Sequence, residues 1–84
     1  MEPAQVLFDY ARRKREEPRV DRACVTAVCE AVRALPARLP FSINVHAATL
    51  SRDPEFLLHL VDCASGHSIE LARITIEIVE HTPE

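Results

Sequence analysis

Two short strand-like runs, separated by a segment that favours a helix, constrain the fold of this 84-residue chain more than any other feature. The runs occupy residues 41–46 and 73–80, and each alternates apolar with polar side chains, as a half-buried strand does. A helix between two strands is the usual connection that makes them parallel neighbours. We therefore predict an α/β fold that contains two adjacent parallel strands.

Strand alternation also assigns each side chain to one face of this predicted sheet. The face toward the connecting helix takes Phe41, Ile43, Val45, Ile74, Ile76 and Ile78. The other face takes Ser42, Asn44, His46, Thr75, Glu77 and Val79. An amide and a carboxylate on matching rows need solvent, a hydrogen-bond network or a cation as their partner. Asn44 and Glu77 are therefore the candidate site residues, and the pattern alone leaves these three partners open.

Helix signals complete the order α-α-β-α-β. A first helix is predicted over residues 3–14 and is broken by residues 16–18. A second is expected from an N-cap at Asp21 to about Leu35, with the apolar stripe Val25, Val28, Cys29 and Val32. A third is expected from an N-cap at Asp53, with Pro54 in its first position, to Gly66 as the residue that follows its end.

Bulk properties exclude several classes of protein. The net charge of −3 gives no reason to expect binding to nucleic acid or to anionic lipid. No apolar run approaches the roughly 20 residues of a membrane span, and the N-terminus lacks the order of a signal peptide. The three cysteines and four histidines show no metal-ligand spacing, and reduced thiols favour the cytoplasm. The basic run at residues 12–15 precedes two glutamates, which favours a solvated helix end.

Five short motifs occur in order along the chain. They are PAQVLF at residues 3–8, VDRAC at 20–24, NVH at 44–46, LSRDPEF at 50–56 and EIVE at 77–80. Together they resemble the N-terminal half of the EAL domain, a bacterial phosphodiesterase that hydrolyses cyclic di-GMP to the linear dinucleotide. The resemblance covers nearly the whole chain.

This resemblance implies a TIM-type (βα)8 barrel whose site lies at the C-terminal ends of the strands and holds Mg²⁺ or Mn²⁺. By position, Asn44 and Glu77 match metal ligands, and Glu80 matches a glutamate that orders the neighbouring loop. Two such cations would activate water and neutralise charge on the phosphoryl group. His46 and Val79 depart from the family, which usually has Ser and Thr at these positions.

The family's Glu-Ala-Leu strand, its Asp-Asp pair and its later Lys have no counterpart in the 84 residues. We therefore expect residues 1–84 to be a single partial EAL-like domain that is inactive alone and binds no metal tightly. We also expect open strand edges to favour homo-oligomers. The alternative is a catalytically dead, EAL-derived regulatory or adaptor module that associates with itself.

Overall fold

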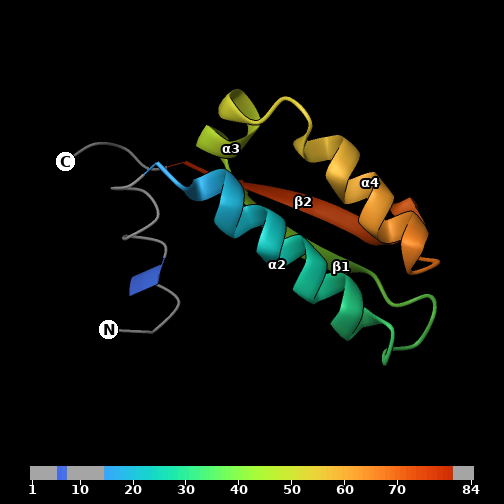
Figure 1. Ribbon diagram of the computed structural model, residues 1–84. Helices are drawn as coiled ribbons and strands as arrows, with labels where there is room; N and C mark the ends of the chain where they lie inside the picture. The colour runs from blue at the N-terminus through green and yellow to red at the C-terminus, as the bar shows by residue number, and fades with distance from the viewer. Residues whose placement is uncertain (1–5, 8–14, 81–84) are drawn as a thin grey trace.

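The computed structural model describes residues 6–7 and 15–80 of the chain. Its elements are α2 (Glu17–Val32), β1 (Phe41–His46), α3 (Ala47–Arg52), α4 (Phe56–Gly66), the 3-10 turn η1 (Leu71–Arg73) and β2 (Ile74–Val79). Val6 and Leu7 are helical, while the rest of the predicted first helix lies outside the described residues. The prediction of a mixed α/β fold is confirmed (Figure 1).

β1 and β2 are parallel neighbours, as predicted, and Phe41 pairs with Ile74 at the start of the register. Figure 1 shows α2 and α4 on the same side of the two strands. The core between these layers consists of Val25, Cys29, Val32, Ile43, Val45, Phe56, Leu60, Ala64 and Ile69. The apolar stripe predicted for the second helix faces this core, with three members buried and Val28 packed against them. No helix in the described part of the chain is long and apolar enough to cross a membrane.

The start of α2 differs from the prediction. The helix begins at Glu17 with Pro18 in its first turn, because a proline there loses no helical hydrogen bond and its φ angle suits the helix. Asp21 is therefore not an N-cap but a buried residue of the helix body. The helix also ends at Val32, earlier than the predicted Leu35.

The connection between the strands contains two helices instead of one. α3 follows β1 directly, and Asp53 is the residue that ends it. The N-cap of α4 is Glu55, so the prediction of Asp53 as its N-cap is wrong. Asp53 instead accepts a hydrogen bond from the backbone N–H of Glu55 at 3.3 Å and holds an ion pair described below.

The predicted end of α4 is wrong by one residue, because Gly66 was expected to follow the helix. Gly66 is the last residue of the helix and does not have a positive φ. The left-handed residue is Ser68, with φ of 57°. The helix is closed by backbone N–H groups of His67 and Ile69 that bond to the Ala64 carbonyl, so this turn does not require the freedom of glycine.

Arg73 connects the starts of the two strands. Its Nε donates to the carbonyl of Leu39 at 2.9 Å, and its Nη2 donates to the carbonyl of Pro36 at 3.1 Å. Its guanidinium carbon lies 5.5 Å from the centroid of the Phe41 ring, within the range of a cation–π contact. The loop before β1 is thereby attached to the residue that precedes β2.

Candidate functional site

Asn44 and Glu77 lie opposite each other in the register of the parallel strands, on the same face of the sheet. Both side chains are exposed, as are Ser42 and Thr75 in the preceding row. The predicted juxtaposition of this pair is therefore confirmed. An amide oxygen and a carboxylate suit a hard cation, but Mg²⁺ needs six oxygen ligands. Among the described residues, no group of three or more His, Cys, Asp or Glu side chains could hold a metal.

The sequence also predicted the placement of Glu80 and His46 at this site. Glu80 is exposed and directly follows β2, and its role stays a prediction. His46 was expected on the open face beside Asn44, but its side chain is buried. The reason is a carboxylate on α2, Asp21, which binds both the backbone and the ring of His46.

Asp21 is the centre of a buried polar cluster at the C-terminal end of β1. Its Oδ2 accepts hydrogen bonds from the His46 backbone N–H at 2.8 Å and from Thr49 Oγ1 at 2.5 Å. Its Oδ1 lies 3.0 Å from Nδ1 of His46, and the side chains of this pair are only 2% and 7% exposed. In the described part of the chain, no buried side-chain nitrogen or oxygen lacks a hydrogen-bond partner. A buried carboxylate is tolerated when its hydrogen bonds are complete, and removal of one partner from such a cluster is strongly destabilising.

Two ion pairs flank this cluster. Glu17, whose side chain is buried, accepts a hydrogen bond from Arg52 Nη1 at 3.0 Å. Arg22 binds Asp53 through two bonds, Nε to Oδ2 at 2.6 Å and Nη2 to Oδ1 at 2.8 Å. The hydrogen bonds from Arg22 hold the pKa of the Asp53 carboxyl below its usual value, and the same pairing raises the pKa of Arg22.

These contacts attach α3 and the residues at its two ends to the first half of α2. We call Glu17, Asp21, Arg22, His46, Thr49, Arg52 and Asp53 the α2–α3 clamp. The hydrogen bond from the His46 backbone N–H to Asp21 attaches the C-terminal end of β1 to α2, two residues after Asn44.

Sequence reasoning missed most of the clamp. A signal was present, because Glu17 and Asp21 continue the four-residue spacing of the buried side chains Val25 and Cys29 toward the start of α2. Carboxylates in line with a core stripe need a buried partner. The sequence did not reveal the partners, because His46 ends β1 and Thr49 lies in α3, 25 and 28 residues away from Asp21.

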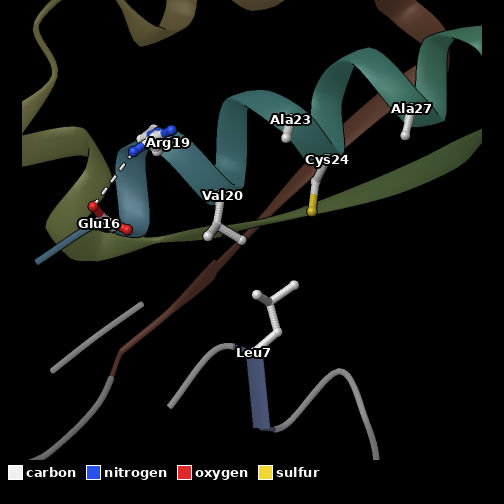
Figure 2. A pocket seen from close by; sticks show the side chains of 7 residues that line it. All are labelled: Leu7, Glu16, Arg19, Val20, Ala23, Cys24 and Ala27. Carbon is white, nitrogen blue, oxygen red and sulfur yellow. Dashed lines mark ion pairs between the residues drawn. The ribbon is translucent and has the colours of Figure 1, made fainter. Parts of the chain in front are cut away.

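A hollow of about 340 Å³ lies on another side of α2. Figure 2 shows Leu7 pointing toward Val20 and Cys24, which line it together with Ala23 and Ala27. At its rim Arg19 and Glu16 form an exposed ion pair at 3.5 Å. Among the described residues, the lining is largely apolar, and its ionisable groups are this pair and Cys24.

No protein-family model, no curated protein and no solved structure gives a significant match to the chain.

Proposed function

We propose that the chain is the N-terminal part of an EAL-type phosphodiesterase domain, which hydrolyses cyclic di-GMP to the linear dinucleotide in the bacterial cytoplasm. The observation that supports this most is the pairing of Asn44 with Glu77 on one face of adjacent parallel strands. In a (βα)8 barrel that face would line the interior, where polar side chains near the C-terminal strand ends form the site.

The residues present fit part of a Mg²⁺ or Mn²⁺ site by the chemistry of their donors. Asn44 would offer its amide oxygen and Glu77 its carboxylate, with the remaining ligands coming from water, substrate and residues beyond these two. A bound cation would supply an activated water and charge neutralisation at the phosphoryl group. The α2–α3 clamp would keep β1 in place while Asn44 orients its oxygen.

The test uses the complete encoded protein and follows hydrolysis of cyclic di-GMP with Mg²⁺ or Mn²⁺. We expect Asn44→Ala and Glu77→Ala each to lower kcat/KM by about 100-fold or more, because each removes a metal ligand. Ser42→Ala, on the same face one row away, is the matched control and should stay within about twofold. Activity that survives Glu77→Ala would refute the ligand assignment, and turnover by residues 1–84 alone would refute the expectation of an inactive chain.

The second candidate function is a self-associating adaptor, and the exposure of β2 favours it. Ile78 lies on the apolar face of its strand but is 57% exposed. In the described part of the chain, the sheet has two strands, so the outer edge of β2 has no strand beside it. Such an edge offers backbone groups to another copy.

A two-fold symmetric pair would join the β2 strands in antiparallel fashion. Centring the pairing on Ile76 places Ile74 opposite Ile78 of the second copy, and Thr75 opposite Glu77. This arrangement keeps the two Glu77 carboxylates from facing each other, which would be unfavourable. Light scattering should then give twice the 9.4 kDa mass of one chain. Ile78→Lys should restore the monomer and Glu70→Lys should not, whereas a wild-type monomer would refute the adaptor.

A further inference from the structure

A second hollow lies where the two strands begin. Its volume is about 220 Å³, and it is lined by the end of α2, the turn after α4, the loop before β1 and the residue before β2. Its polar side chains are those of Arg33, His67, Ser68 and Arg73. Among the described residues that line it, none is acidic. This strand-start hollow therefore presents positive charge and hydrogen-bond donors.

Arg73 is held in position before any ligand binds. Its Nε and Nη2 donate to the carbonyls of Leu39 and Pro36, and its guanidinium lies over the ring of Phe41. Within the described part of the chain, its Nη1 has no hydrogen-bond partner, and no carboxylate forms an ion pair with Arg73 or Arg33. A guanidinium that is already oriented loses little conformational freedom when an anion binds.

The other polar side chains of the lining also have unpaired atoms. The Arg33 side chain is exposed and hydrogen-bonds to no described residue, and the same holds for the Ser68 hydroxyl. Nδ1 of His67 lies 2.8 Å from the Cys63 carbonyl, which can only accept, so a neutral ring carries its proton there and Nε2 has no described partner. Ser68 also has a φ of 57°, a left-handed conformation that a serine adopts at a cost.

The cations of this hollow have one structural role that must be weighed first. They offset the partial negative charge of helix C-terminal ends, and the residues that cap α2 and α4, Arg33 and His67, both line the hollow. Each helix end carries about half a negative charge, so two ends offset about one of the two arginine charges. Backbone N–H groups of Ala34 and His67 also bond to the last carbonyls of the helices. The lining itself therefore keeps a positive charge, although the chain as a whole carries −3.

We propose that the strand-start hollow binds a phosphate group, either as the free ion or as the end of a small monoester. The planar fork of a guanidinium matches phosphate oxygens, because its N–H donors lie parallel. Leu35 and Ile69 add an apolar wall that the organic part of a monoester can contact. The volume is below that of pockets for drug-sized ligands, so this organic part is small.

The strand-start hollow is separate from the pair formed by Asn44 and Glu77. Arg73 precedes β2 and lies four positions before Glu77 in the chain, and neither member of the pair lines the hollow. Binding of a phosphate group here requires neither a metal cation nor phosphodiesterase activity. The proposal therefore does not rest on the proposed function.

The test titrates the full chain at low ionic strength with phenyl phosphate and, separately, with inorganic phosphate, and follows backbone amide signals by NMR. We expect saturable binding with a Kd of about 1 mM or lower, with shifts at Arg33 and Ser68 and none at Asn44 or Glu77. Tighter binding of phenyl phosphate would assign a monoester, and equal or tighter binding of inorganic phosphate would assign the free ion. The absence of saturable shifts at Arg33 and Ser68 with both probes would overturn the proposal.

A pair of variants separates this site from general attraction of anions to arginine. Arg33→Gln should weaken binding of the better probe by about 10-fold, because it removes a charged donor, and it breaks no described contact of the fold. Arg38→Gln is the matched control, since Arg38 is an exposed arginine of the loop before β1 that does not line the hollow. It should change the Kd by less than about twofold. Equal weakening by the two variants would overturn the proposal.

Discussion

The two strands have similar alternating sequences but very different surroundings. β1 places Ile43 and Val45 at 3% and 1% exposure, whereas Ile78 on the corresponding face of β2 is 57% exposed. Ile76 is only half-buried. The difference lies in the neighbours, because α2 packs along β1 and the α2–α3 clamp closes its C-terminal end. An apolar strand residue is therefore buried only where another element reaches it.

This difference predicts where the chain is vulnerable, and the largest effect should come from the clamp. Asp21→Ala should lower the free energy of unfolding by about 3 to 5 kcal/mol, because it leaves buried donors of His46 and Thr49 without their acceptor. Urea unfolding measures this loss. Asp62→Ala, at an exposed position of α4, should change stability by less than about 0.5 kcal/mol. A loss below about 1 kcal/mol for Asp21→Ala would show that the clamp does not hold β1.

The second prediction compares two isoleucines on the same face of the sheet. Ile43→Ala should cost about 3 kcal/mol, because it opens a cavity in the packed core. Ile78→Ala removes the same atoms from a site that already faces solvent, so it should cost less than about 1 kcal/mol. Urea unfolding at the protein concentration used for light scattering gives both values. Equal losses would mean that β2 is covered in solution, as the self-associating candidate requires.

The smallest predicted effect concerns acid. Because Arg22 lowers the pKa of Asp53 below its ordinary 3.8, the ionised pair stabilises the fold fully above that pH. This contribution should disappear as the pH falls from 3.8 through the lower value of the folded state. The difference in urea midpoint between wild type and Arg22→Gln should therefore shrink in that range. Arg19→Gln, which removes an exposed arginine of the same helix, should show no such trend.

The sequence was sufficient to predict the features that depend on local periodicity. The bounds of β1, the parallel pairing with β2 and the placement of Asn44 opposite Glu77 all follow from alternation and a helical crossover. The core stripe of α2 follows from helical spacing in the same way. These features are predictable because each is specified by residues only two to four positions apart.

The features that sequence reasoning missed depend on contacts between distant residues. Asp21 and Asp53 both have the chemistry of an N-cap, and each is used instead for a partner more than 20 residues away. Residues 47–52 carry weak local signals, and α3 is held by Asp21 and Glu17 from α2. His46 is buried because Asp21, 25 residues earlier in the chain, binds its backbone and its ring. Local propensity cannot reveal a choice that is decided by tertiary partners.

Arg73 also bears on how this architecture can vary over evolution. Parallel strands lack the short turn that aligns a hairpin, so their alignment must come from elsewhere. Here the contacts of Arg73 with Leu39, Pro36 and Phe41 align the strand starts directly. The pairing of Asn44 with Glu77 therefore does not depend on the length of the connection alone. Across related chains, an arginine should persist at the start of the second strand.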